Sequence, residues 1–197
     1  MPNCKVVFLG EPGVGKTCIV SRFLSGIYDD RTESSNGASY ASKRIEVDGQ
    51  YLRLDLWDTA GQEKFRSLTK FFYKDASIVI LVYDITKRES FEELIGYWFD
   101  KIRTSGDKNI IIGIAGNKSD NVDEEVVSEN EAKEFAQSTG AVFGLTSAFR
   151  DTGINELFEK VGAKYLDVLR ENGGGQIGNR NNIRLGNNRR KKDGKSC

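Results

Sequence analysis

Five short apolar runs recur along the chain, and they constrain its fold more than any other feature. They read CKVVFLG (4–10), RLDLWD (53–58), SIVILVYD (77–84), NIIIGIAG (109–116) and AVFGLTS (141–147). Their apolar character is continuous rather than alternating, which suits strands buried on both faces of a parallel sheet. Patterns typical of helices lie between them and after the last one, at about 16–25, 89–104, 128–139 and 153–170. We therefore predict a doubly wound α/β fold.

One connection departs from this repeat. Within KRIEVDGQYLRLDLWD, the dipeptide Asp48-Gly49 separates two strand-like segments, and it is the strongest short-range signal of a hairpin. One strand is therefore expected to pair antiparallel. Ser128 followed by Glu131 fits a capping box, with Gly140 as a C-terminal stop. These signals set the bounds of the helix expected at 128–139.

The charges are unevenly distributed, although 29 Lys and Arg balance 29 Asp and Glu. Residues 176–197 carry seven basic side chains against one acidic, a net charge of +6, so residues 1–175 carry −6. After about Asn172 the chain is rich in Gly, Asn and Arg and has no apolar face, so it cannot bury enough surface to offset its ordering entropy. We expect one folded domain over 1–171 and a flexible basic tail over 172–197.

The residue types exclude several classes of chemistry. The chain has no histidine, which excludes histidine-based triads and histidine metal sites. Cys4, Cys18 and Cys197 are too few and too scattered for a disulfide framework, which favours a reducing compartment. No run approaches the roughly 20 apolar residues of a membrane-spanning helix, and none at the start resembles a signal peptide. We expect a cytoplasmic protein.

The segment GEPGVGKT (10–17) has the GxxxxGKT spacing of a phosphate-binding loop and lies between the first strand and the first helix. The N-terminus of that helix adds partial positive charge. Lys16 is expected to reach the β- and γ-phosphates and to act in catalysis, and the Thr17 hydroxyl to bind Mg²⁺. Pro12 has no N–H, but it precedes the donors expected from Gly13 through Thr17.

The candidate nucleotide-binding residues of this segment are Gly13, Val14, Gly15, Lys16, Thr17 and Cys18. The Cys18 thiol has two interpretations, a redox-active group beside the phosphate or a small packing group. Alone, the loop indicates only a nucleoside triphosphate, so adenylate-type kinases and ATPases stay open, as does a glycine-rich turn that binds nothing.

The segment WDTAGQ (57–62) narrows the choice. Asp58 ends a buried strand, where a carboxylate facing a metal-bound phosphate is expected, and Gly61 allows its backbone N–H to approach the γ-phosphate. The Gln62 amide can accept from an attacking water and donate to the departing phosphoryl group, so Gln62 is the second candidate catalytic residue. A strand followed by an ordinary turn is the alternative.

The segments NKSD (117–120) and TSA (146–148) each follow a predicted strand, at the end where doubly wound folds bind ligands. The Asp120 carboxylate can accept from both N1–H and N2–H₂ of guanine, whereas adenine offers no such donor pair. Lys118 would lay its alkyl stem over the ring, and the Ala148 N–H would donate to guanine O6. The candidate base-binding residues are Asn117, Lys118, Asp120, Ser147, Ala148 and Phe149.

With these motifs the chain resembles a small GTPase of the Ras superfamily over about residues 3–170, and within it the Rab family. The Rab resemblance is carried by RLDLWDTAG (53–61), KFRSLT (64–69), YKDA (73–76) and LVYDIT (81–86). It implies a P-loop G domain with a six-stranded, mostly parallel sheet, one antiparallel strand and five helices. It also implies hydrolysis of GTP to GDP, a Mg²⁺ cofactor, and two switch segments that order around the γ-phosphate.

Matched by position, Tyr28 would lie beside the guanine, and Tyr40, Trp57 and Phe72 would form an aromatic surface that effectors recognise. A core or hairpin-packing role for the last three is equally open. In the first switch, ESSNGASY (33–40), Ser35 stands at the position of a Thr that binds both nucleotide and Mg²⁺, and it keeps the hydroxyl.

Three further positions depart from the family pattern. Asn36 replaces an apolar residue, which leaves the identity of the effectors open. Pro12 stands where related switches carry a small residue, close to where Gln62 would act. Phe149 stands where Lys or Leu is common, and because the contact there is expected from the backbone, we expect no effect of this change.

The tail carries the expected membrane signal. Rab tails are usually prenylated on paired cysteines, whereas this chain ends KSC with Cys197 and has no CaaX box. One lipid chain on Cys197, together with the basic run RRKKDGK, suffices for a two-signal anchor. The alternatives are an unmodified thiol and a nucleic-acid or nuclear-import patch.

The resemblance also implies partners and a place in the cell. The partners are a guanine-nucleotide exchange factor, a GTPase-activating protein, GTP-state effectors, a GDP-dissociation inhibitor and a prenylation escort, with no nucleic acid. The protein would bind reversibly to the cytosolic face of an endomembrane and regulate vesicular traffic. Alternatives are a GTP-binding scaffold with negligible hydrolysis, another Ras-superfamily switch, and a P-loop kinase, which leaves NKSD unexplained.

Overall fold

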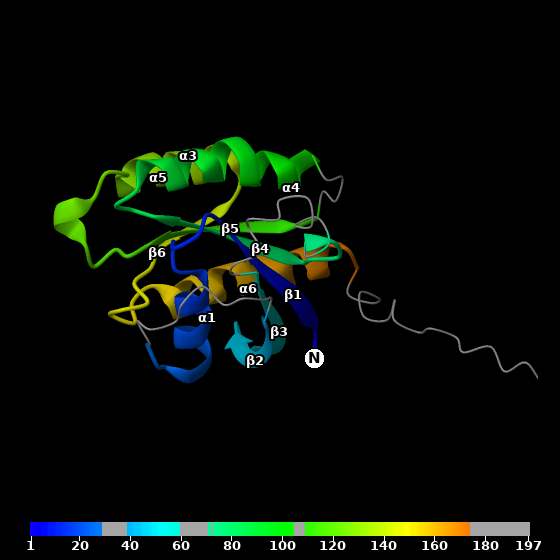
Figure 1. Cartoon of the computed structure of the whole chain (residues 1–197). Coiled ribbons are helices and arrows are strands. Elements are labelled where there is room, and N and C mark those ends of the chain that lie inside the picture. The colour runs from blue at the N-terminus through cyan, green and yellow to red at the C-terminus, as the bar shows by residue number, and fades with distance from the viewer. Residues whose placement is uncertain (29–38, 60–70, 72, 105–108, 174–197) are drawn as a thin grey trace, which may run out of the picture.

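A six-stranded sheet with strand order β2-β3-β1-β4-β5-β6 organises the molecule (Figure 1). The structure is a computed structural model that describes residues 1–28, 39–59, 71, 73–104 and 109–173. Neighbouring strands are parallel except β2 and β3, which form an antiparallel hairpin. The strands are β1 (Asn3–Leu9), β2 (Ser39–Val47), β3 (Gln50–Asp58), β4 (Ile78–Asp84), β5 (Ile111–Asn117) and β6 (Val142–Leu145).

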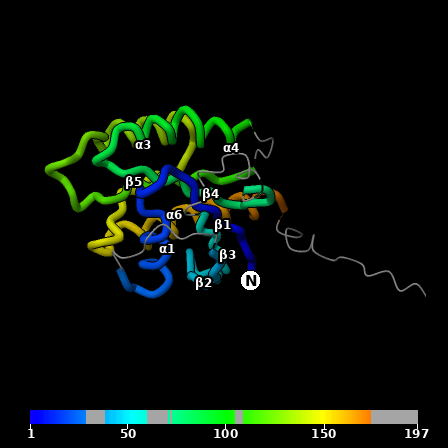
Figure 2. Tube along the Cα trace, in the orientation of Figure 1, coloured from blue at the N-terminus to red at the C-terminus, as the bar shows by residue number. Residues whose placement is uncertain are grey.

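Helices cover both faces of the sheet, which confirms the doubly wound fold (Figures 1 and 2). One face carries α1 (Lys16–Ser25) and α6 (Ile154–Glu171). The other carries α5 (Glu129–Thr139) and a continuous helical stretch made of α3 (Arg88–Glu93), η2 (Leu94–Phe99) and α4 (Asp100–Thr104). Counted in this way, the described residues contain four of the five helices that the resemblance implies. A short 3₁₀ turn, η3 (Val122–Glu124), follows β5.

Alternate residues of the central strands enter two separate cores. In β1, Val6 and Phe8 pack into the core that includes residues of α1 and α6. Val7 and Leu9 pack into the core that includes residues of α3, η2 and α5. All seven residues of β4 are buried, and so are all seven of β5. Burial on both faces is the reason that these strands are continuously apolar in sequence.

The local signals that set turns and helix ends are confirmed. Asp48 and Gly49 have φ of 50° and 74°, both positive, as the hairpin turn that matches strand twist requires. The Ser128 side chain accepts a hydrogen bond from the backbone N–H of Glu131, and Gly140 ends α5 with φ of 70°. These features depend only on neighbouring residues, which explains why the sequence predicts them.

The helix predicted over 89–104 is present, but its middle is π-helical rather than α-helical. Trp98 lies in this π-helical segment, is 1 % exposed, and donates its indole N–H to Glu11 Oε1 at 3.2 Å. The helical stretch is thereby joined to the segment GEPGVGKT. No local sequence signal predicts the π-helical turns, since they contain ordinary aromatic and aliphatic residues.

The last described helix, α6, ends at Glu171, within one residue of the end that the sequence predicts for the helix at 153–170. Residues 174–197, including the predicted lipid attachment site, lie outside the described part of the chain. Among the helices that are described, none combines the length and the apolar character that crossing a membrane requires.

Candidate nucleotide-binding site

The predicted site residues follow the carboxyl ends of parallel strands, and these ends lie side by side. Phe8 of β1 is in register with Asp58 of β3, and Asp84 of β4 with Asn117 of β5. The segment 10–17 follows β1, and TSA follows β6. Because parallel strands end at the same edge of a sheet, four motifs that are far apart in sequence meet there.

The backbone of the phosphate loop depends on glycine at two close contacts. Gly10 has φ of 146°, and a Cβ on it would lie 2.2 Å from the Val82 carbonyl oxygen. Gly15 has φ of 96°, and its Cβ would lie 2.3 Å from Asn117 Nδ2. Only glycine combines a positive φ with such close approach, so the loop and the segment NKSD fit together only with Gly15 in place.

The Lys16 side chain is held inside this loop. It is 4 % exposed, and its ammonium group donates to the carbonyl oxygens of Gly10 and Glu11, each at 3.0 Å. Lys16 is also the first residue of α1, whose N-cap is Gly15 and carries no side-chain cap. Backbone N–H groups at the start of α1 and a positive charge therefore converge on the loop, which is the arrangement that binds phosphate.

Asp58 lies next to the same loop. Its side chain is 1 % exposed at the end of β3, and the neighbouring Thr59 hydroxyl donates to the Phe8 carbonyl oxygen at 2.6 Å. This bond joins the chain after β3 to β1, immediately before the phosphate loop. Thr17 follows Lys16 in α1. Ser35, Gly61 and Gln62, the other candidates for metal binding and catalysis, lie outside the described residues.

Asn117 connects the phosphate loop to the segments predicted to bind the base. Its Nδ2 donates to the Val14 carbonyl oxygen at 2.8 Å, and its Oδ1 accepts from the Thr146 hydroxyl at 3.2 Å. Asn117 and Thr146 are both buried. Both ends of one amide are therefore used to lock three segments of the chain together.

Asp120 is held by a neighbouring hydroxyl. Ser147, which is 1 % exposed, donates to Asp120 Oδ1 at 2.5 Å and accepts from the Arg150 backbone N–H at 2.9 Å. A buried hydroxyl with both donor and acceptor satisfied fixes the orientation of the carboxylate. Ser147 thus orients Asp120 through this hydrogen bond, whereas the sequence suggests only that Ser147 binds the nucleotide.

Lys118 is fixed by an ion pair that the sequence motifs do not include. Its backbone has φ of 64°, and its ammonium group lies 2.6 Å from Oδ2 of Asp84, whose side chain is fully buried. The other oxygen, Oδ1, accepts from the Thr86 N–H at 2.9 Å and from the Thr86 hydroxyl at 2.7 Å. Burial alone would raise the pKa of Asp84, but the bonds from Lys118 and Thr86 hold it below its ordinary value.

A cavity of about 390 Å³ lies among these segments, a size typical of small-molecule sites. Its lining includes most of the residues predicted to bind the base, together with Gly15 of the phosphate loop. The lining residues are Gly15, Cys18, Tyr28, Asn117, Lys118, Asp120, Asn121, Ala148 and Phe149. All of them except Asn121 are nucleotide-binding candidates from the sequence, and Asn121 directly follows NKSD.

Several supporting residues are not predicted by the sequence, and the role of one predicted residue is undervalued. Asp84 ends a buried strand in LVYDIT, and a carboxylate at such a place is a usable signal. Thr146 is the first residue of TSA, and its type alone does not indicate that it holds Asn117. Arg22 donates to the carbonyl oxygens of Ala148 and Phe149, and nothing in its local sequence indicates this. The Phe149 side chain, from which we expect no effect, lines the cavity.

Two residues of the predicted effector surface lie together on the β2–β3 hairpin. Tyr40 and Trp57 are directly paired across the strands, with ring centroids 5.2 Å apart. Tyr40 is 51 % exposed, and its hydroxyl donates to Asp55 Oδ1 at 2.9 Å. The contact is compatible with both hairpin packing and recognition by a partner. Phe72 and Cys197 lie outside the described residues.

Comparison with known proteins assigns the chain to a family. The model of the Ras family matches residues 5–167. Human Ras-related protein Rab-22A is 42 % identical over 157 residues, which cover 80 % of each chain. Mouse Ras-related protein Rab-31 is 39 % identical over 183 residues, 93 % of this chain and 91 % of its own.

A plant protein shows the same relationship. Ras-related protein Rab5A of Oryza sativa subsp. japonica is 37 % identical over 164 residues, 83 % of this chain and 80 % of its own. The family match includes the loop and the residues that line the cavity, and it agrees with the resemblance drawn from the motifs. The chain belongs to the Ras family of small GTPases and, within it, to the Rab proteins, which hydrolyse GTP and act in membrane traffic.

Proposed function

We propose that GTP and GDP bind in the cavity of about 390 Å³, with the guanine against residues 117–120 and 146–149 and the phosphates against residues 10–17. The observation that carries this proposal is the double bonding of Asn117, to Val14 of the loop and to Thr146. One side chain joins the segment for the phosphates to both segments for the base, so a ligand that spans them meets a single prearranged surface.

On the base, the Asp120 carboxylate accepts from N1–H and N2–H₂ of guanine, and the Ala148 N–H donates to O6. Ser147 fixes the carboxylate, which lowers the entropy lost when the base binds. The Lys118 stem lies over the ring while Asp84 holds its ammonium group. Adenine lacks the donor pair that Asp120 requires. If adenine bound, the charged carboxylate would lose its hydrogen-bond donors, and this cost makes the site select guanine.

On the phosphates, the N–H groups from Gly13 through Thr17 and the Lys16 ammonium group surround the β- and γ-phosphate oxygens. Lys16 already lies inside the loop on two carbonyl oxygens, so its charge is positioned before the nucleotide arrives. The N-terminus of α1 adds its partial positive charge. Pro12 is exposed and precedes these donors, so its missing N–H costs the site nothing.

The residues present fit a magnesium ion. Mg²⁺ prefers hard oxygen ligands, and the Thr17 hydroxyl and the buried Asp58 carboxylate beside the loop supply two of them. Ser35 supplies a third oxygen ligand, the hydroxyl of the first switch. When bound, the ion neutralises charge on the β- and γ-phosphate oxygens.

In hydrolysis, a water oxygen attacks the γ-phosphorus, the bond from the γ-phosphorus to the β–γ bridging oxygen breaks, and GDP and phosphate form. Gln62 orients the water through both ends of its amide. Lys16 and the loop N–H groups stabilise the negative charge that develops on the bridging oxygen. With no arginine of the motifs placed to act on the phosphates, intrinsic turnover is slow, and a GTPase-activating protein supplies one.

The γ-phosphate controls the switches. Ser35 and Gly61 hold the two switch segments while GTP is bound, and hydrolysis releases them. Effectors recognise the GTP form through a surface that includes Tyr40, Trp57 and Phe72. An exchange factor, a GDP-dissociation inhibitor and a prenylation escort complete the cycle. The folded domain that carries out this cycle spans residues 1–171, and residues 172–197 form the tail of the protein.

The tail anchors the protein reversibly to the cytosolic face of an endomembrane. A prenyl group on Cys197 supplies one signal, and the five basic residues of RRKKDGK supply the second, at roughly 1 kcal/mol for each Lys or Arg near an anionic leaflet. Mass spectrometry of the native protein tests this directly, because an unmodified Cys197 contradicts it.

The nucleotide proposal is tested with the purified full chain. Calorimetric titration with GDP, GTP and ATP in Mg²⁺ buffer is expected to show tight binding of the guanine nucleotides only. Single-turnover assays are expected to show that phosphate is released slowly, and that Gln62→Leu abolishes this release. Tight GTP binding with no phosphate release, even with activating proteins, would instead identify a scaffold. Equal affinity for ATP and GTP contradicts the assignment of the base site.

A further inference from the structure

An aromatic pair stands at the edge of the cavity. Tyr28, which follows α1, and Phe149, which follows β6, have ring centroids 5.5 Å apart and are nearly perpendicular, at 81°. Both rings line the cavity. Phe149 is 59 % exposed, so most of its ring is available to a ligand. The two residues are 121 positions apart in sequence, so their contact joins two distant segments at the cavity.

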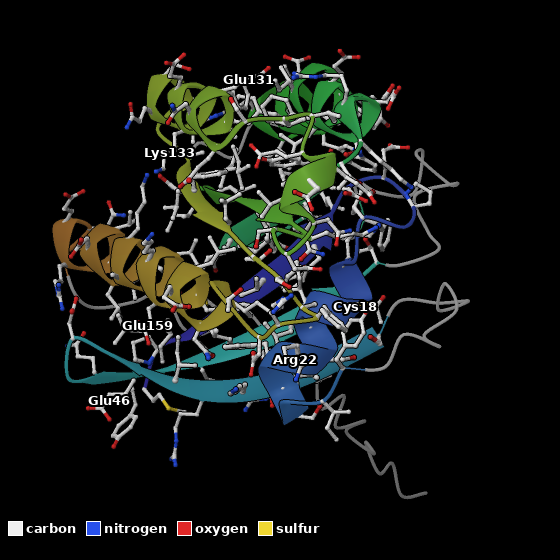
Figure 3. All side chains as sticks on the ribbon, turned by 90° about the vertical axis from the view of Figure 1, so that its left-hand side faces the viewer. Cys18, Arg22, Glu46, Glu131, Lys133 and Glu159 are labelled. Atoms are coloured by element: carbon white, nitrogen blue, oxygen red, sulfur yellow. The ribbon has the colours of Figure 1, made fainter. Side chains whose placement is uncertain are left out.

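One arginine ties both rings to the same helix. Arg22 of α1 donates from Nε to the Ala148 carbonyl oxygen at 2.8 Å and from Nη2 to the Phe149 carbonyl oxygen at 3.1 Å. Its guanidinium carbon lies 5.7 Å from the centroid of the Tyr28 ring. Figure 3 shows Arg22 one turn beyond Cys18 on α1, beside the segment that leads into α6. Arg22 therefore positions both walls of the cavity edge at once.

The planar fork of arginine is required for this arrangement. Nη1 is used as well, donating to the Gly26 carbonyl oxygen at 2.5 Å, so three nitrogens of one guanidinium serve three carbonyl oxygens. Lysine has a single ammonium group and cannot span these acceptors. The loop that holds Ala148 and Phe149 is thereby fixed to the end of α1, from which the chain continues to Tyr28.

We propose that Arg22, Tyr28 and Phe149 form a clamp over the edge of the bound guanine, and that the Phe149 ring sets how slowly the nucleotide leaves. The inference rests on the proposed function, because it requires the guanine in this cavity. Lys118 bounds the ring from NKSD, and the aromatic pair bounds it from the other two segments. Contact between a base and one aromatic side chain slows dissociation by about 10-fold or more.

The clamp contacts the base and not the phosphates. Phe149 and Arg22 lie in the part of the site formed by α1, Tyr28 and residues 146–149, whereas the γ-phosphate belongs to the loop 10–17 and the switches. Loss of the Phe149 ring should therefore speed the release of GDP and of GTP by the same factor. Leucine, which is common at this position in the family, is smaller and has no π-face to stack on the base.

The test is dissociation of fluorescent GDP, and of a fluorescent non-hydrolysable GTP analogue, from the full chain in excess unlabelled nucleotide. Phe149→Ala is expected to release both about 10-fold faster, Phe149→Leu less so, and Phe149→Tyr at the rate of the unmodified protein. Tyr51→Ala is the matched control, since Tyr51 is an equally exposed aromatic of β3 (54 %) that does not line the cavity. Unchanged release from Phe149→Ala overturns the clamp.

Arg22→Lys tests the positioning role. It is expected to speed release, and in combination with Phe149→Ala the total effect should fall short of the product of the two, because part of the Arg22 effect acts through the Phe149 ring. Fully multiplicative effects overturn the coupling. Phe149→Ala alters no buried group, so its result decides the proposal even where Arg22→Lys lowers the melting temperature. Absence of any guanine-nucleotide binding by the unmodified protein would instead overturn the proposed function.

Discussion

The proposed base side of the site (117–120 and 146–149) and the proposed phosphate side (10–17 with Asp58) are built by different means. On the base side, side chains hold side chains: Ser147 holds Asp120, and Thr146 holds Asn117. On the phosphate side, the backbone conformation shapes the site. Gly10 and Gly15 have positive φ, and Lys16 is bonded to carbonyl oxygens of its own loop. The base side is therefore sensitive to the loss of polar atoms, and the phosphate side to the addition of a Cβ.

The two sides meet where Asn117 Nδ2 lies against Gly15. Gly15→Ala should produce the largest effect, because it adds the strain of a left-handed backbone, about 1–2 kcal/mol, to a Cβ contact of 2.3 Å. We expect the free energy of unfolding to fall by at least about 3 kcal/mol and nucleotide binding to weaken on both sides of the site. Urea denaturation of the nucleotide-free protein measures the first quantity.

Gly140→Ala is the matched control, since Gly140 has φ of 70° but open space around its Cβ position. It should cost only the backbone strain of about 1–2 kcal/mol. Equal losses in the two variants would show that the contact with Asn117 relaxes at no cost, and that the two sides are not fitted to one another.

Asp84→Ala should have the next largest effect, and on the base side alone. It removes a fully buried carboxylate and leaves Lys118 and Thr86 without their acceptor. The Lys118 side chain is 33 % exposed, so water can partly solvate its charge once Asp84 is gone. We therefore expect the free energy of unfolding to fall by about 2–3 kcal/mol, which is less than the full cost of breaking a buried pair. Asp167→Ala, which breaks the exposed pair with Arg170, should cost less than about 1 kcal/mol.

The same carboxylate gives a dependence on pH. Its folded-state pKa lies below its ordinary value, so the ionised form contributes stability above the unfolded-state pKa, and this contribution is lost as pH falls through the folded-state pKa. Below about pH 4 the unmodified protein should lose stability more steeply than Asp84→Asn. Denaturation series from pH 6 to pH 3 compare the slopes, and parallel curves would contradict the pKa shift.

Ser147→Ala should have a moderate effect that is confined to the base. Loss of one hydrogen bond to a charged group leaves Asp120 less well oriented, so the affinities for GDP and GTP should both fall about 10-fold. Titration calorimetry measures both. Ser138→Ala removes a comparable but exposed hydroxyl bond on α5 and should leave both affinities unchanged. A fall for GTP alone would place Ser147 with the phosphates instead.

Pro12→Gly should have the smallest effect on binding, although it lies within the phosphate loop. The residue is exposed and donates no N–H, so GDP affinity should change by less than about 3-fold. The bulk of its ring lies close to where Gln62 and an activating arginine would meet the γ-phosphate, so the rate of hydrolysis should change. Single-turnover hydrolysis with and without an activator tests this, and identical rates would show that the ring takes no part.

Features that depend on near neighbours were predictable from the sequence. The Asp48-Gly49 turn, the Ser128 cap and the end of α6 all appear where the sequence predicts them. The buried strands were recognisable because burial on two faces requires continuous apolar side chains. The motifs also identify most of the cavity, since each of them must follow a strand to reach the ligand.

Features that depend on distant residues were not predictable from the sequence. Arg22 reaches the Ala148 carbonyl oxygen across 126 positions, and the bond uses a backbone acceptor, so no residue type at position 148 indicates it. The fit of Gly15 against Asn117 and the packing of Phe149 on Tyr28 likewise require the strand order. The sequence by itself determined the strands, the turns and the identity of the ligand, because these follow from residue type and spacing. The tertiary structure alone decided which side chains hold the ligand-binding groups in place, because those contacts exist only once the carboxyl ends of β1, β4, β5 and β6 lie side by side.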